Sequence, residues 1–135
     1  MGGTPPHAWK GKNMGDITPH FSRSEFVCKC CGADGIRDEL VTALERIRVF
    51  YGRPMVVSSG VRCEAHNAAS GGKPGSAHVR GLAADIVCAS ARDRMELIRI
   101  AMSQGVSRIG VGKDFVHLDI DVTLPQDVLW LYGGA

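Results

Sequence analysis

The sequence predicts a single α+β domain in which two main helices pack on a small, largely antiparallel sheet. Apolar residues recur at helical spacing in two segments, and short runs rich in β-branched residues lie around those segments. The length of 135 residues suits one domain, which buries about two-thirds of its unfolded surface. We therefore expect a flexible N-terminal arm over residues 1–18 and one folded domain over residues 19–135.

Charge and hydropathy restrict the possible partners. Sixteen basic and fourteen acidic side chains leave a net charge of +2, too weak to indicate a nucleic-acid partner. No apolar run approaches the length of about 18 residues that a membrane span needs. The N-terminus lacks the apolar segment of a secretory signal, so we expect synthesis in the cytoplasm without a signal peptide.

The first elements follow from capping and periodicity. Ser22 and Glu25 form a capping-box pattern that predicts a short helix. A long amphipathic helix is predicted over residues 38–51, ended by the Gly-Arg-Pro sequence at 52–54. Its apolar stripe consists of Leu40, Val41, Leu44, Ile47 and Tyr51. The β-branched run at 55–57 predicts a buried strand.

The middle of the chain begins with a Gly-rich loop at residues 70–76, followed by a predicted strand over 83–87. A second amphipathic helix is predicted over 92–104, and Gly105 ends it. The side chains expected to face inward are Met95, Leu97, Ile98, Ala101 and Met102.

The last elements are strands. Residues 108–111 and 115–120 are separated by three residues, which predicts a hairpin and hence an antiparallel pair. Residues 128–131 are expected to add an edge strand.

Five cysteines without a secretion signal do not predict a disulfide framework. Cys28, Cys30 and Cys31 form a C-K-C-C run, while Cys63 and Cys88 lie far away in sequence. Taken as one C-x-C-C run, the three differ from the paired cysteines of zinc fingers. We expect reduced, partly packed thiols; a disulfide and a second, structural metal site are the alternatives.

The residues best suited to chemistry are His78 and Asp85, joined by a path that Gly81 allows to turn tightly. A lone histidine and aspartate often form only a surface pair. His117, however, completes a set of two imidazoles and one carboxylate, the kind of set that holds a catalytic zinc and leaves one position for water. Asp114 lies three residues earlier and offers a general base, provided that it sits in the turn or on a bulge.

Two motifs together resemble the zinc-binding signature of the M15 peptidases: Ser76-x-His78-x-x-Gly81-x-Ala83-x-Asp85 and Asp114-x-x-His117. That family includes D-alanyl-D-alanine carboxypeptidases and phage L-alanyl-D-glutamate endolysins. Three further segments resemble its phage and prophage branch: His20-Phe-Ser-Arg-Ser-Glu-Phe26, Ser59-Gly-Val-Arg-Cys63 and His66-Asn67-x-x-x-Gly71-Gly72. The resemblance covers roughly residues 20–120 and implies the fold that the family shares with the hedgehog signalling domain.

The resemblance also implies roles for particular residues. His78, Asp85 and His117 would bind one zinc ion, and Asp114 would be the general base. Many relatives carry Glu at that position. Arg62 would polarise the scissile carbonyl or hold a substrate carboxylate, as a guanidinium with fixed donors can.

Other residues have two interpretations each. Asp119 either orients His117 or competes with Asp114 as the base. Ser76 either contacts substrate or caps the loop, and His66 either faces substrate or is structural. Trp130 is expected to pack in the core, with a cleft wall as the alternative.

The predicted function is that of a zinc metallopeptidase cutting a D-amino-acid-containing bond of bacterial peptidoglycan, in carboxypeptidase or endopeptidase mode. A phage or prophage enzyme of this type, a monomer, would reach the cell wall by a holin-type route or as part of a phage particle. Two alternatives are a non-catalytic, zinc-stabilised binding module and a phage tail or particle component. The presence of both Asp114 and Arg62 favours the enzyme over the binding module.

Overall fold

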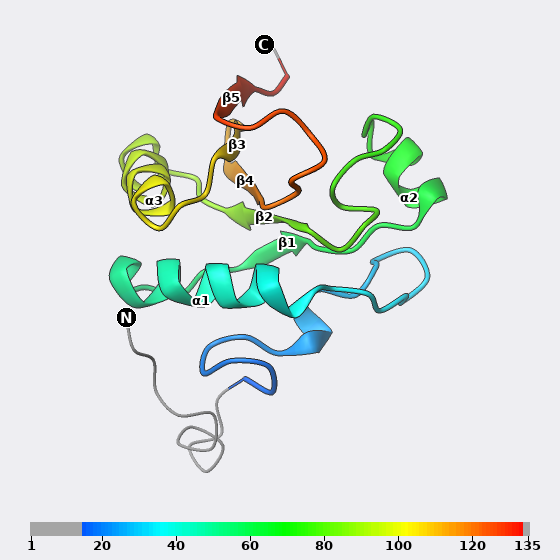
Figure 1. Cartoon of the computed structure of the whole chain (residues 1–135), viewed down its shortest axis with the longest axis horizontal. Coiled ribbons are helices and arrows are strands. Elements are labelled where there is room, and N and C mark those ends of the chain that lie inside the picture. Colours follow the sequence, from blue (N-terminus) through cyan, green and yellow to red (C-terminus); the bar gives the residue numbers. More distant parts are fainter. Residues whose placement is uncertain (1–14, 134–135) are drawn as a thin grey trace.

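The computed structural model describes residues 15–133 (Figure 1). Its helices are α1 (Asp38–Tyr51), α2 (Glu64–Ala69) and α3 (Ala91–Ser103), preceded by a short 3-10 turn at Arg23–Glu25. In that turn the Glu25 carboxylate accepts the backbone N–H of Ser22 at 2.7 Å, as the capping-box pattern predicts. Most of the predicted arm, residues 1–14, lies outside the described residues. Residues 16–17 form a bend, and Thr18 pairs with Phe21 across a turn at residues 19–20.

One mixed sheet has the strand order β1-β2-β4-β3-β5, and the α+β prediction is confirmed. All neighbours pair antiparallel except β3 and β5, which are parallel. The predicted hairpin is the β3–β4 pair, and β5 is the predicted edge strand. The strands are β1 (Val57–Ser59), β2 (Ala83–Val87), β3 (Arg108–Val111), β4 (Phe115–Asp119) and β5 (Val128–Leu131).

The first strand differs from its prediction: β1 covers residues 57–59 and not 55–57. Its pairing begins where Val57 lies opposite Ile86 of β2, and a register shift follows before Ser59. Of the predicted residues 55–57, only Val57 lies in the strand. The strand bounds depend on where the partner strand β2 lies, which residue propensity does not encode.

Helix α1 has the predicted bounds. Leu40, Val41, Leu44 and Ile47 are buried. Gly52 ends the helix in the left-handed conformation, with φ of 72°, and its N–H donates to the Arg48 carbonyl.

Helix α3 starts and ends one residue earlier than predicted, and two of the residues predicted to face inward are exposed. Met95 and Met102 are 67% and 60% exposed, whereas Leu97 and Ala101 are fully buried. Ile98 packs against the core from its edge. The error arises because Met is found on both the buried and the exposed face of helices. Apolar spacing that counts Met95 and Met102 therefore predicts an inward face that is rotated about the helix axis from the observed one.

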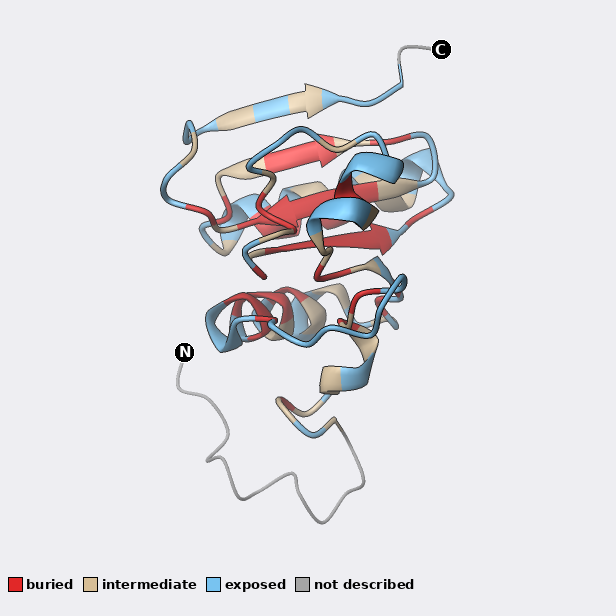
Figure 2. Ribbon diagram, turned by 90° about the vertical axis from the view of Figure 1, so that its right-hand side faces the viewer, coloured by how far each residue is buried: buried red, intermediate tan, exposed pale blue. Residues whose placement is uncertain are grey.

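The sheet has two different faces (Figure 1). Helices α3 and α2 lie on opposite sides of it, and α1 lies along its β1 edge. Figure 2 shows the central strands buried and β5 more exposed. The core face contributes Ala84, Ile86, Ile109, Val116 and Leu118 to the hydrophobic cluster under α1 and α3. Among residues 15–133, no helix is long and apolar enough to cross a membrane.

Candidate metal centre

The opposite face of the sheet carries one row of residues that crosses all five strands. Asp85 of β2 is the register partner of His117 of β4, and His117 is the partner of Gly110 of β3. Ser59 and Trp130 extend the row to β1 and β5. Register partners in a sheet share a face, so strands far apart in sequence present these residues side by side.

His78 reaches this row from the loop before β2. The loop turns at Gly81, whose φ is +74°. A Cβ at Gly81 would lie 2.0 Å from the carbonyl oxygen of Gly35, which only glycine permits. The motif glycine is thus required by close packing of the loop against the segment before α1.

Three donor atoms converge where the loop meets the row. Asp85 Oδ1 lies 3.2 Å from His78 Nε2 and 3.0 Å from His117 Nδ1. The far nitrogen of each ring is held by an acceptor: His78 Nδ1 donates to the Gly60 carbonyl at 2.7 Å, and His117 Nε2 donates to Asp119 at 2.7 Å. These acceptors determine which nitrogen of each imidazole carries the proton.

The donor set fits a divalent metal ion. With both far nitrogens protonated, the neutral rings present lone pairs toward a carboxylate oxygen, and the three ligand atoms lie within 4.8 Å of one another. Electron-rich atoms at this separation need a cation or protons between them. Two imidazoles and one carboxylate, each ring oriented by an outer acceptor, are the ligands that a catalytic zinc takes.

The electrostatics of the cluster keep the Asp85 carboxylate deprotonated, which is the form that binds a metal ion. Burial raises the pKa of Asp85, but hydrogen bonds with His117 and His78 outweigh burial and hold this pKa well below its usual range. Burial lowers the pKa of His117, whereas the carboxylates of Asp119 and Asp85 raise it above its usual value. The metal-free cluster therefore holds a proton between anionic oxygens, at the place where a metal cation would sit.

Arg62 joins the cluster from the segment between β1 and α2. Its Nη2 donates to Asp85 Oδ2 at 3.1 Å, while its Nε donates to Ser59 at 3.0 Å and Nη1 to Asn67 at 3.4 Å. Asp85 thus faces the two rings with one oxygen and Arg62 with the other. The guanidinium fixes the orientation of the carboxylate.

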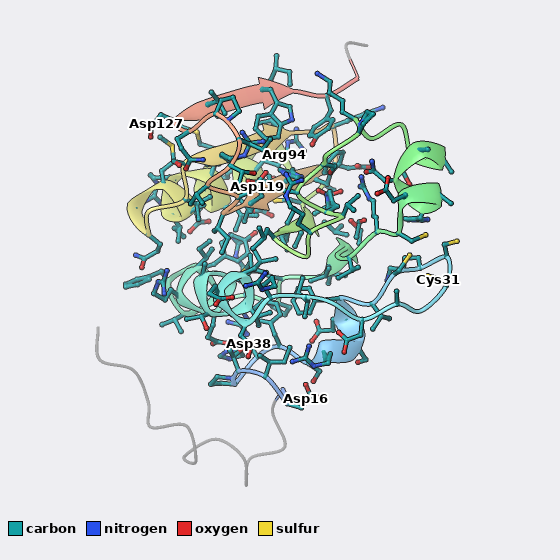
Figure 3. The ribbon with its side chains drawn as sticks, turned by 45° about the vertical axis from the view of Figure 1, so that its right-hand side comes forward. Asp16, Cys31, Asp38, Arg94, Asp119 and Asp127 are labelled. Carbon is teal, nitrogen blue, oxygen red and sulfur yellow. The ribbon has the colours of Figure 1, made fainter. Side chains whose placement is uncertain are left out.

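The two acidic residues around His117 lie in different places. Asp119 is 1% exposed and accepts from Arg108 at 2.7 Å and from the Asp121 backbone, besides His117 (Figure 3). Asp114 is exposed in the β3–β4 turn, where its backbone carbonyl accepts the backbone N–H of Cys88. Two strand residues lie between it and His117, so the two Cα atoms are about 10 Å apart. The structure brings Asp119 to the cluster and does not bring Asp114 there.

Ser76 and His66 lie around the site without touching the three ligand atoms. The Ser76 hydroxyl accepts the backbone N–H of His78 at 3.2 Å, which is the loop-capping interpretation of this residue. His66 is half-buried on α2, and its backbone N–H donates to the Cys63 sulfur. The loop that follows β4 is held by Asp121, whose carboxylate accepts from Thr123 and from Arg80 at 2.6 Å.

Two aromatic residues lie near His117: Tyr132 was not considered from the sequence, and Trp130 had a cleft wall only as its alternative interpretation. Trp130, expected in the core, is half-buried with its ring centroid 5.2 Å from that of His117, and the Tyr132 ring lies 6.2 Å away. Gly110 makes room for both, since a Cβ there would lie 2.5 Å from Tyr132 and 2.6 Å from Trp130. Alternation along β5 was the only available signal, and it does not tell which residues of β5 lie on the side of the sheet that carries His117.

The comparison with known families agrees with this geometry. A search of curated proteins found no match. The model of the family described as Peptidase M15 matches residues 19–119, which include Arg62 and all three ligand candidates. The match spans most of the chain and ends with β4, the strand that carries His117. The chain therefore belongs to the M15 family of peptidases.

Proposed function

We propose that the protein is a zinc-dependent peptidase that hydrolyses a D-amino-acid-containing bond in the peptide stem or cross-link of bacterial peptidoglycan. The observation that carries the proposal is the convergence of His78 Nε2, Asp85 Oδ1 and His117 Nδ1, with the far ring nitrogens held by Gly60 and Asp119. A zinc ion bound there supplies Lewis acidity, which activates water and polarises a peptide carbonyl at neutral pH.

Arg62 provides the second part of the site. A guanidinium has five N–H donors, and the contacts with Ser59, Asn67 and Asp85 use three of them. Within residues 15–133 the other two make no hydrogen bond, and they suit the oxygen that becomes negative during hydrolysis or a terminal carboxylate. The same residue thus orients Asp85 and contacts the substrate.

Trp130 and Tyr132 would bound the site on the β5 side. Burial raises the pKa of Tyr132 above its usual value, so its hydroxyl remains protonated and is a donor at neutral pH. The partly exposed rings beside His117 give a peptide substrate an apolar surface with polar edges. We assign this wall to the positioning of the stem peptide.

The general base remains a prediction from motif spacing. Asp114 is the residue that the spacing indicates, and its carboxylate must approach the cluster to act. Asp119 has both oxygens occupied by His117, Arg108 and a backbone N–H, which suits it to hold His117 in place. The variant Asp114→Asn tests the assignment: a base is required for turnover but not for metal binding, so the variant should keep zinc and lose turnover.

The decisive experiment is mass spectrometry of purified peptidoglycan after digestion with the zinc-loaded protein. We expect new stem-peptide fragments, whose masses identify the bond and distinguish carboxypeptidase from endopeptidase cleavage. A chelator-treated sample and the variant His117→Ala are the controls and should release nothing. Zinc bound stoichiometrically with no release from several wall chemotypes would contradict the peptidase proposal and favour the binding module.

The biological setting is part of the same proposal. A phage or prophage origin, with access to the wall through a holin-type route or on a phage particle, rests on the resemblance of the segments around Phe26, Arg62 and Asn67. Protein found free late in infection would support the lytic role, whereas protein that copurifies with tails would contradict it.

A further inference from the structure

Four of the five cysteines gather at one edge of the molecule, away from the candidate metal centre. The Sγ atoms of Cys28, Cys31 and Cys63 all lie within 4.8 Å of one another. Cys30, the fourth cysteine of this region, is exposed in the same turn, one residue before Cys31. Figure 3 shows Cys31 at the outer end of a loop with further sulfur atoms beside it. We call these four residues the thiol cluster.

A tight turn places three of the thiols together. The Cys28 N–H donates to the Ala33 carbonyl at 2.9 Å, and the Gly32 N–H donates to the Cys28 carbonyl at 2.7 Å. Gly32 follows Cys31 with φ of +74° and lets the chain reverse. Within the run, Cys28 and Cys31 are separated by two residues, which is the C-x2-C spacing of zinc sites. Treating the three cysteines as one C-x-C-C run concealed this pair.

Backbone donors stabilise the thiolate form of one member of the cluster, Cys28. The Cys63 N–H donates to the Cys28 sulfur at 3.4 Å, and the His66 N–H donates to the Cys63 sulfur at 3.4 Å. The first of these contacts lowers the pKa of Cys28 to about 6, against the opposing effect of burial, and N–H groups of Cys31 and Cys30 add to it. Thiolate, and not thiol, is the form that binds metals.

We propose that Cys28, Cys31 and Cys63, whose sulfurs converge, bind a second zinc ion in a structural site, with the exposed Cys30 of the same turn as the fourth thiolate. Four sulfur ligands leave no position open for water, which distinguishes the site from the one at His78 and Asp85. With Zn–S bonds of about 2.3 Å, tetrahedral sulfurs lie ~3.8 Å apart. The sulfurs of Cys28, Cys31 and Cys63, within 4.8 Å of one another, need only a small contraction to reach this distance, and the exposed Cys30 side chain turns inward to complete the site. A disulfide joins two sulfurs at about 2 Å, whereas here at least three approach one centre.

The second zinc would fix the loop that serves the peptidase site. Phe26, two residues before Cys28, accepts the Val61 N–H at 2.8 Å. A Cβ at Gly60 would lie 2.6 Å from the Phe26 carbonyl oxygen, so the two segments touch directly. The Gly60 carbonyl holds His78, and Arg62 immediately precedes Cys63. The thiol cluster thus ties the N-terminal segment to the loop that orients the first metal centre.

The test uses the full-length protein, purified under reducing conditions and loaded with zinc or cobalt. We expect two zinc ions per chain by elemental analysis. The cobalt form should show intense thiolate-to-cobalt charge-transfer absorption, which a site of imidazoles and carboxylate does not produce. Cys31→Ser, at an exposed position, and Cys63→Ser should each lose one zinc and that absorption.

Two controls separate this site from the peptidase site. Cys88→Ala removes the fifth cysteine, which is buried beside Tyr51 and outside the cluster, and should keep both zinc ions and the absorption. His78→Ala should lose the other zinc and keep the absorption. A reduced wild-type protein that binds at most one zinc and shows no thiolate absorption would overturn the proposal. Isolation of an iron–sulfur centre at these residues would equally overturn it.

Discussion

Replacing Asp119 by Asn should weaken both the metal centre and the fold. In the wild type, Asp119 has no exposed side-chain surface and accepts Arg108 Nε and His117 Nε2, each at 2.7 Å. Asparagine keeps the shape but removes the charge, and its amide group turns a donor toward one of these donors. The lost charge affects Arg108 and His117, and the two effects are measured separately, as stability and as zinc affinity.

For the fold, the magnitude follows from the buried ion pair. The Arg108 side chain is 11% exposed, and removal of one partner of a buried pair costs about 3–5 kcal/mol. Arg108 also donates to the Pro125 carbonyl at 2.6 Å and lies over the Trp130 ring, which offsets part of the cost. We therefore expect the free energy of unfolding of the zinc-free variant to fall by about 3 kcal/mol, measured by denaturant titration.

For metal binding, the substitution removes the carboxylate that orients the candidate ligand His117. Such replacements lower metal affinity by about 10- to 100-fold, and we expect this range for zinc in competition with a chromogenic chelator. Asp114→Asn is the matched control, because it changes an exposed aspartate on the other side of His117 and should leave both zinc affinity and stability unchanged. Wild-type zinc affinity and stability in Asp119→Asn would refute the role given to this carboxylate.

Three further predictions concern the scaffold and are all measured by denaturant unfolding. Gly81→Ala should destabilise the protein by about 2–5 kcal/mol, because the backbone there is left-handed and a Cβ would overlap the Gly35 carbonyl; stability equal to wild type would show that the loop relaxes freely. Leu97→Ala should cost about 2–5 kcal/mol by opening a cavity, while Met95→Ala on the exposed face of α3 should stay within about 0.5 kcal/mol; equal losses would mean that α3 is rotated. Burial raises the pKa of Asp121, but its hydrogen bonds hold that pKa below the usual value. The ionised carboxylate therefore adds to the free energy of unfolding above about pH 4, and this addition is lost as the pH falls through the lowered pKa. Asp121→Asn should lose less stability than wild type over that acid range, and parallel curves of stability against pH would contradict this.

The local elements were predictable because their determinants are local. Apolar spacing and Gly52 define α1, and the short loop at 112–114 defines the hairpin that carries His117. The spacing of His78 and Asp85 around Gly81 indicated a metal site before any contact was known. In each case the relevant residues are neighbours in the chain, so their pattern is visible in the sequence.

Tertiary structure alone decided which residues surround the metal centre. The row from Ser59 to Trp130 exists because five strands pair in one register, and strand order is not a local property. The same pairing keeps Asp114 in the turn and places Asp119 against His117, although both acids lie within three residues of it in sequence. The sequence by itself indicated the three candidate ligands and the chemistry that such a set suits. The parallel pairing of β3 with β5 and the meeting of Cys28 with Cys63, 35 residues apart, needed the fold, because only packing brings such distant segments into contact.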